Sequence, residues 1–389
     1  MSQQVRGSAR PAWLLAVALV VMGLNLRAAI TSVAAVLPQM RVELQLDATT
    51  AALLTSLPVL AFAAMSAPTA TVARRFGVDR SMIVAGLALG LFTLIRPFTP
   101  LAGLLLATMF IGIAITVGNV LVPVVVRRDF ADHRGPMTSL TVGAITGGAA
   151  LVAALTAPIA TVVGWRWSLA VWGLTALAAT AIYALAAPHK PVQPEPQTTR
   201  SGWVWRRPAA WALAGYFALQ ASCFYAATAW LPTILPAVAG VSDAVGATAT
   251  AVFHFAGSTG ALTIPVILTR SRSRRMVTVL VSAGWLALSL GLILAPSMMW
   301  LWLAIGGFSQ GGTFALVMAL MTIRAADATA VRDLSAMVQS LGYAAAALAP
   351  ILIGWLLDGV GPGAALNLTL GMSIGMVGMA VIIGSRKPI

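Results

Sequence analysis

The chain has 389 residues, of which 59% are hydrophobic and only 9% are charged. A soluble domain carries about 25% charged residues, so this composition excludes an ordinary soluble globule. The formal net charge is +14, but the basic residues are dispersed over short segments, which argues against a nucleic-acid partner and favours anionic lipid. The single cysteine, Cys223, excludes an intrachain disulfide, and no Cys/His cluster indicates a metal or other cofactor.

Twelve long apolar runs are predicted to be membrane-spanning helices, because about 20 mostly apolar residues cross the hydrocarbon core. In chain order they cover 12–37, 48–73, 81–99, 101–126, 137–163, 166–187, 208–236, 245–269, 276–295, 297–323, 334–357 and 363–384. The first run follows Arg6 and Arg10 as a signal peptide would, yet it continues to Leu37 without a persuasive cleavage site. We interpret it as the first helix of an all-α integral membrane protein.

Lys and Arg residues fall almost entirely into every second gap between these runs. With the N-terminus placed in the cytoplasm, the cytoplasmic segments hold 20 of the 24 basic residues: Arg6, Arg10, Arg74, Arg75, Arg80, Arg127, Arg128, Arg134, Lys190, Arg200, Arg206, Arg207, Arg270, Arg272, Arg274, Arg275, Arg324, Arg332, Arg386 and Lys387. The outer gaps, with the run ends that border them, hold only Arg41, Arg96 and Arg166, and Arg27 lies deep inside a run. Short basic segments stay cytoplasmic, so we expect a multi-pass protein of a bacterial plasma (inner) membrane with both termini inside.

The longest polar interruption, 188–207, divides six predicted helices from six others. Its prolines are typical of a stiff linker. The predicted organisation is therefore an N-terminal six-helix bundle over 1–187, a cytoplasmic linker over 188–207 and a C-terminal six-helix bundle over 208–389.

The two halves also echo each other in sequence. Arg127-Arg128-Asp129-Phe130 follows the fourth run much as Arg324-Ala325-Ala326-Asp327 follows the tenth, and Pro158 corresponds to Pro350. Two similar six-helix halves, related by an axis along the membrane normal, are the plan of major facilitator transporters. In that plan the substrate binds near the membrane midplane between the halves.

Several short segments, in order along nearly the whole chain, carry a more specific resemblance. They are Asn25-Leu26-Arg27 with Thr31-Ser32-Val33, Leu53-Leu54-Thr55-Ser56-Leu57-Pro58-Val59, Gly118-Asn119-Val120-Leu121-Val122-Pro123, Gly164-Trp165-Arg166-Trp167, Phe224-Tyr225 with Ala229-Trp230-Leu231-Pro232, Gln310-Gly311-Gly312 and Gln339-Ser340-Leu341-Gly342-Tyr343. This pattern resembles the cyanate/2-nitroimidazole transporter (CynX/NimT) subfamily of the major facilitator superfamily. The resemblance implies a small-molecule transporter, but it does not single out one cargo.

The segment between the second and third runs resembles a general superfamily signature. Arg75, Gly77 and Arg80 match it, whereas Arg74 stands where most members carry an acidic residue. The resemblance implies that Arg75, Gly77 and Arg80 take part in gating at the cytoplasmic side. The alternative is that these arginines only fix the orientation of the chain.

Arg27 is the charged residue deep inside an apolar run, about 22 Å along its helix at 1.5 Å per residue. Every acidic residue lies in a loop or at a helix end, so Arg27 has no obvious carboxylate partner. A charge at this depth costs about 2.5 to 3.5 kcal/mol and is tolerated where it is buried, paired or hydrated. We expect its guanidinium to face the central cavity and bind an anionic or strongly electronegative substrate. The alternative is an arginine that snorkels outward or binds helix carbonyls.

Other polar residues at similar depth are candidates for the lining of the same cavity. They are Asn25, Asn119, Gln220, Tyr225, Gln310, Gln339 and Tyr343. Any of them could instead form hydrogen bonds between helices. His254 is the histidine inside a run, and it could accept a proton during transport or bind substrate; helix packing is the alternative.

These features together predict a secondary transporter of a small anionic or polar molecule that works by alternating access. The alternative is a proton-coupled exporter of drug-like heterocycles. An enzyme is not expected, since the runs contain no paired carboxylates and no His-Glu-x-x-His segment. The expected partners are the small-molecule substrate, the lipid bilayer and, as a candidate coupling ion, protons, and the chain is expected to be a monomer.

Overall fold

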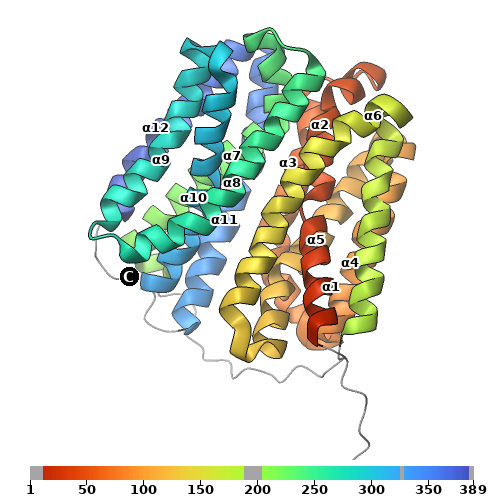
Figure 1. Ribbon diagram of the computed structural model, residues 1–389, viewed down its shortest axis with the longest axis vertical. Coiled ribbons are helices and arrows are strands. Elements are labelled where there is room, and N and C mark those ends of the chain that lie inside the picture. Colours follow the sequence, from red (N-terminus) through yellow and green to blue (C-terminus); the bar gives the residue numbers. More distant parts are fainter. Residues whose placement is uncertain (1–11, 188–203, 325–327, 385–389) are drawn as a thin grey trace, which may run out of the picture.

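The computed structural model describes residues 12–187, 204–324 and 328–384, and these ranges contain helices and no strand (Figure 1). The long helices are α1 (Ala12–Asn25), α2 (Ala28–Glu43), α3 (Ala48–Phe76), α4 (Val78–Ile95), α5 (Leu101–Asp129), α6 (Arg134–Ala186), α7 (Pro208–Ala239), α8 (Asp243–Arg270), α9 (Arg274–Leu294), α10 (Met299–Arg324), α11 (Ala328–Gly359) and α12 (Pro362–Ile383). The prediction of an all-α membrane protein is confirmed. Most of the predicted linker, 188–203, lies outside the described residues.

The predicted runs and the observed helices differ in two places. The first run contains both α1 and α2, which are separated by a break at Leu26 and Arg27. Conversely, α6 contains the fifth and sixth runs, and as one straight helix of 53 residues it would be about 80 Å long, far more than a bilayer core. Gly164 interrupts it with a φ of 79°, and Figure 1 shows two limbs that run in opposite directions. Each limb follows one predicted run, so the twelve predicted crossings are all present.

The helices form two groups, α1 to α6 and α7 to α12, which lie beside each other in Figure 1. Pairs of helices that join the groups include α3 with α11, α6 with α8, and α2 with α7. Small residues allow close approach within a group. A Cβ on Gly311 of α10, for example, would overlap the backbone of Gly257 in α8.

We name the two ends of the molecule after the orientation that the distribution of Lys and Arg predicts. We call the end that carries the α2–α3 connection and Gly164 the outer end, and the end that carries Gly77 the inner end. At the outer end, Asp358 of α11 accepts hydrogen bonds from Arg41 of α2 at 2.7 Å and from the amide of Ala48 in α3 at 2.5 Å. These contacts join the two groups on the outer side of the space where a substrate is expected.

Candidate functional site

The break between α1 and α2 determines where Arg27 points. Arg27 has φ −118° and ψ −9°, and its carbonyl accepts the amides of Ile30 at 3.2 Å and Thr31 at 3.0 Å. The hydroxyl of Thr31 donates to the same carbonyl at 3.0 Å. Arg27 is therefore the residue on which α2 begins, and not the midpoint of a continuous helix as the apolar run suggests. Its side chain leaves the chain at this break.

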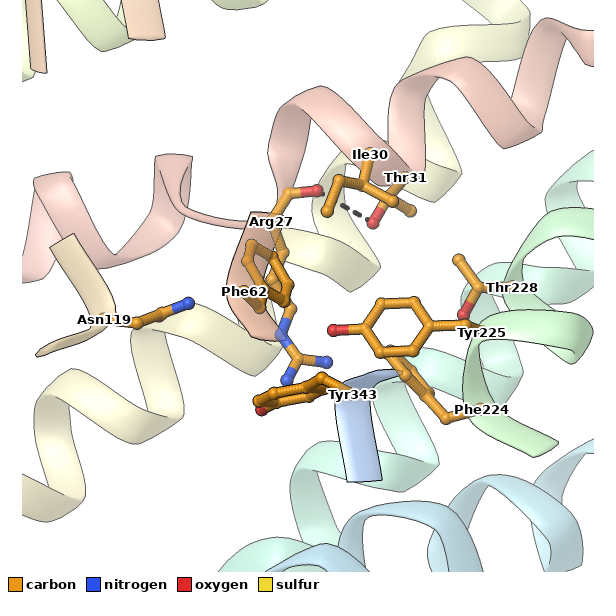
Figure 2. A pocket seen from close by; sticks show the side chains of 9 residues that line it. All are labelled: Arg27, Ile30, Thr31, Phe62, Asn119, Phe224, Tyr225, Thr228 and Tyr343. Atoms are coloured by element: carbon orange, nitrogen blue, oxygen red, sulfur yellow. Dashed lines mark hydrogen bonds between the residues drawn. The ribbon is translucent and has the colours of Figure 1, made fainter. Parts of the chain in front are cut away.

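The guanidinium of Arg27 enters a pocket between the two groups of helices (Figure 2). The pocket is lined by Arg27, Ile30, Thr31, Phe62, Asn119, Phe224, Tyr225, Thr228 and Tyr343. The first five belong to α2, α3, α5 and the break, and the last four to α7 and α11. The cavity volume is about 10 Å³, close to the smallest space that holds one water molecule. Both groups thus close around Arg27 in this conformation.

Aromatic rings surround the guanidinium. Its Cζ lies 4.8 Å from the centre of the Phe224 ring and 5.8 Å from that of Phe314, distances at which a cation is attracted to a ring face. Among the described residues no carboxylate forms an ion pair with Arg27. Figure 2 shows the hydroxyl of Tyr225 directed toward the guanidinium and the ring of Tyr343 beside it. The pocket therefore has a net positive charge with unused donor capacity.

A second set of ring contacts closes the pocket across the two groups. Phe62 of α3 lies 5.5 Å from Tyr343 and 6.4 Å from Tyr225, measured between ring centres. The rings of Tyr225 and Tyr343 are 6.4 Å apart. These rings offer apolar faces to a flat ligand, whereas Arg27 and the tyrosine hydroxyls offer hydrogen-bond donors at its edge.

Four residues predicted from the sequence line this pocket: Arg27, Asn119, Tyr225 and Tyr343. The sequence reasoning missed the apolar members Ile30, Phe62 and Phe224, and it missed Thr31 and Thr228. The Thr228 hydroxyl is buried and has no hydrogen-bond partner in the described part of the chain. Because Thr228 lies three residues after Tyr225 in α7, a search along that helix face for hydroxyls would have found it.

Other predicted residues make hydrogen bonds within the bundles. Asn25 donates to the Val21 carbonyl at 2.8 Å and accepts the Thr175 hydroxyl at 2.7 Å. Gln220 donates to the backbone carbonyl of Gln310 at 3.4 Å, and the Gln310 side chain packs against Gly257. Gln339 is half-buried in α11, one turn before Tyr343, and is not among the lining residues.

His254 lies behind the pocket wall. Its imidazole is buried, and its ring centre is 6.0 Å from that of Phe224, the ring on which Arg27 stacks. The Phe253 ring lies 5.3 Å away on the same helix. His254 and the Arg27 guanidinium thus contact the same aromatic ring, that of Phe224.

The residues expected to take part in gating lie at the α3–α4 turn. Gly77 has a φ of 88°, a conformation that favours glycine, and it ends α3. Arg75 stacks on Phe76, with Cζ 5.5 Å from the ring centre, and Arg80 is exposed. The neighbouring Asp79, which the sequence reasoning placed in a loop, is buried and binds Arg128 of α5.

Comparison with known proteins identifies the family. A model of the Major Facilitator Superfamily matches residues 13–350. The chain belongs to this superfamily. The 2-nitroimidazole transporter of Escherichia coli (strain K12) is 32% identical over 344 residues, 87% of this chain and 86% of the relative. The cyanate transport protein CynX of the same organism is 29% identical over 339 residues, 86% and 88% of the two chains.

A third relative is an uncharacterized transporter, YycB, of Bacillus subtilis (strain 168), which is 31% identical over 350 residues, 89% of this chain and 87% of the relative. The predicted subfamily, that of the cyanate and 2-nitroimidazole transporters, is confirmed by these relatives. The protein is a multi-pass membrane transporter of small molecules.

Solved structures share the fold at low sequence identity. A bacterial homolog of the human lysosomal transporter Spinster, in an inward-facing conformation, has a TM-score of 0.72 and 17% identity, and 97% of this chain and 95% of that chain are covered. The nucleoside transporter NupG has a TM-score of 0.74 and 14% identity, with 97% and 99% covered. Both likenesses support the two-bundle architecture.

Proposed function

We propose that this transporter moves a small anion or a compact polar heterocycle by alternating access, and that the substrate binds at Arg27. The observation that carries the proposal is the guanidinium in a pocket between the bundles, without a carboxylate partner among the described residues. The relatives named for 2-nitroimidazole and cyanate transport support this substrate class. One is a flat ring with an electronegative nitro group, and the other is a linear anion.

The chemistry of the pocket fits the two parts of such a ligand. Arg27 offers a planar fork of donors that suits paired oxygen atoms or one end of a linear anion. The hydroxyls of Tyr225, Tyr343 and Thr228 can donate to a second acceptor atom. The ring faces of Phe62 and Phe224 bury the remainder of the ligand. A charged hydrogen bond in this water-poor space is stronger than one in bulk water.

The alternative function is proton-coupled export of drug-like heterocycles. Pockets for drug-sized ligands measure about 300 to 1,000 Å³, whereas the space beside Arg27 is about 10 Å³. A small substrate therefore requires much less separation of the bundles, which favours the first proposal. Proton coupling through His254 would serve either cargo, because an imidazole can take up and release a proton whichever ligand is bound. Its contact with the Phe224 ring, on which Arg27 stacks, connects it to the pocket.

Binding by variants of Arg27 tests the proposal. Arg27→Ala removes a charged hydrogen bond worth about 1.5 to 3 kcal/mol, and we expect the Kd for cyanate or 2-nitroimidazole to rise by about 10- to 150-fold. Arg27→Lys keeps the charge but loses the planar fork, so its Kd should lie between those of Arg27→Ala and the parent protein. The measurement is equilibrium binding to purified, correctly folded protein.

Arg270→Ala is the matched control, because Arg270 is exposed at the C-terminal end of α8 and does not line the pocket. It should bind as the parent does. Uptake into proteoliposomes with and without a pH gradient, in parent and His254→Gln protein, separates proton coupling from binding. Parent-like affinity in Arg27→Ala would show that Arg27 serves only the architecture.

A further inference from the structure

Arg96 is a second arginine inside the N-terminal bundle. It begins the short 3-10 helix η1 (Arg96–Phe98) that connects α4 to α5 at the outer end, yet only 1% of it is exposed. Its Nη2 donates to the carbonyl of Ala29 at 3.1 Å. Its Nε and Nη1 are buried without a partner among the described residues. A buried arginine of this kind is costly in a membrane protein, and an apolar side chain of similar length would fill the space without that penalty.

The acceptor of this hydrogen bond lies next to the break that directs Arg27. Ala29 is the second residue of α2, and α2 begins on the Arg27 carbonyl. Ile30 and Thr31 line the pocket, while Ala29 is not among the lining residues. At about 100° per residue, Ala29 lies about 200° around the helix from Thr31. Arg96 therefore holds the first turn of α2 from the side opposite the pocket.

The segment before the break is held by close packing. A Cβ on Gly148 of α6 would overlap the backbone of Leu24, and a Cβ on Gly118 of α5 would overlap the Leu26 side chain. The end of α1 is thus packed closely against α5 and α6. The start of α2 has the hydrogen bond from Arg96, and the direction of the Arg27 side chain depends on both.

We propose that Arg96 is a positioning residue of the substrate site. Its hydrogen bond to the Ala29 carbonyl fixes the angle between α1 and α2 and thereby places the Arg27 guanidinium against the Phe224 ring and beside Tyr225 and Tyr343. The proposal rests on the proposed function of Arg27. Arg96 itself does not touch the substrate, and its effect passes through the backbone of the broken helix.

Binding by Arg96 variants is the first part of the test. Arg96→Met keeps the length of the side chain and removes the donor, so a displaced Arg27 should lose part of its charged hydrogen bond to the ligand. Binding of cyanate and 2-nitroimidazole should weaken by about 10-fold, less than in Arg27→Ala. The KM for uptake should rise by a similar factor, with little change in kcat. Arg96→Lys restores a donor at this depth and should recover part of the affinity. Arg166→Met is the matched control, because Arg166 is another outer arginine but lies on the surface.

A reporter that needs no substrate is the second part. Cys223 is the single cysteine, so Ile30→Cys in a Cys223→Ser background gives one thiol on the pocket face of α2. Its rate of modification by a small methanethiosulfonate reagent should change with Arg96→Met, recover with Arg96→Lys and stay unchanged with Arg166→Met. If Arg96→Met does not fold, Arg96→Lys and Arg96→Gln carry the same comparison.

The two parts separate the failure of this proposal from the failure of the proposed function. A parent-like thiol rate in folded Arg96→Met overturns the positioning role, whether or not affinity falls. A changed thiol rate together with parent-like affinity in Arg27→Ala supports positioning of the helix and rejects Arg27 as the substrate-binding group. A changed rate with weakened affinity in both Arg96→Met and Arg27→Ala supports both.

Discussion

The two ends of this transporter use arginine–carboxylate pairs in different ways. At the outer end, Arg41 of α2 binds Asp358 of α11 at 2.7 Å, and the Ala48 amide of α3 donates to the same carboxylate. Arg41 also lies over the ring of Trp230 in α7, with Cζ 5.7 Å from its centre. We call the set Arg41, Ala48, Trp230 and Asp358 the outer latch. Every contact in it joins the N-terminal group of helices to the C-terminal group.

At the inner end, the corresponding cluster lies within one group. Arg128 of α5 binds both oxygens of Asp79 in α4, at 2.8 and 3.1 Å, and also binds Asp129 at 2.7 Å. The hydroxyl of Tyr183 in α6 donates to Asp79 at 2.8 Å. Asp79 is 3% exposed, whereas Asp358 in the latch is 41% exposed. We call Asp79, Arg128, Asp129 and Tyr183 the inner cluster.

If transport proceeds by the proposed alternating access, this difference predicts which contacts change. A rigid-body movement of one bundle against the other must break the outer latch, but it can leave the inner cluster intact. A contact that must break repeatedly has to be weak, and partial exposure keeps the latch weak through solvent screening. A contact within one bundle can stay buried throughout, and removing one partner of a buried pair is costly because it leaves the other charge without compensation. The inner cluster should therefore govern stability and the latch should govern conformation.

The largest predicted effect is on the inner cluster. Asp79→Ala removes the main acceptor of the buried Tyr183 hydroxyl and of the half-buried Arg128 guanidinium, which keeps Asp129 as a partner. It should lower stability by about 3 kcal/mol, the low end of the range for breaking a buried pair. Thermal unfolding of the purified protein measures the loss. Asp132→Ala is the control, since Asp132 is exposed near the same end. Equal midpoints for the two variants would contradict a structural role for the inner cluster.

A smaller and different effect is expected at the outer latch. Asp358→Ala removes the acceptor for both Arg41 and the Ala48 amide, and because Asp358 is partly exposed the change should be about 1 kcal/mol, or about fivefold in the conformational equilibrium. The Ile30→Cys reporter should then react faster with an impermeant thiol reagent added outside, and thermal stability should change little. High salt should reduce the difference between variant and parent. An unchanged reaction rate would mean that the latch does not hold the outer end closed.

The fold could be predicted from the sequence because bilayer thickness and the positions of basic residues constrain it strongly. The burial of the charged residues in the inner cluster could not be predicted in this way. Asp79 follows two arginines and a glycine, so hydropathy places it in an exposed loop, but the packing of α5 and α6 over the start of α4 buries it. Likewise, no acidic residue lies near Arg96 in the sequence to suggest a partner. Only the structure shows that its side chain is directed into the bundle, where it donates to the Ala29 carbonyl.

The candidate site was predicted in part for a related reason. Arg27 stands out because a charge at membrane depth needs a specific environment, and Asn119, Tyr225 and Tyr343 were found as polar residues at similar depth. Gln220 met the same criterion but donates to a backbone carbonyl of α10. Sequence alone does not distinguish these cases, since the partner of a polar group is supplied by the neighbouring helix. The break at Arg27 was also hidden, because the apolar run continues through it.

The smallest predicted effect belongs to a second ion pair at the outer end. This pair tests whether the outer latch acts because it joins the two bundles or only because it lies at the outer end. Arg166 binds Glu43, and Trp165 donates to the same carboxylate at 2.5 Å. This pair resembles Arg41–Asp358 in exposure, but α2 and α6 both belong to the N-terminal group, so bundle movement does not break it. Exposed pairs contribute little to stability, and we expect Arg166→Gln to leave thermal stability, substrate affinity and the outside reactivity of the Ile30→Cys reporter unchanged. If Arg166→Gln instead raised the outside reactivity of the reporter as much as Asp358→Ala does, loss of any charge at the outer end would be enough to open it. The contacts between the two bundles in the outer latch would then not explain why the outer end stays closed.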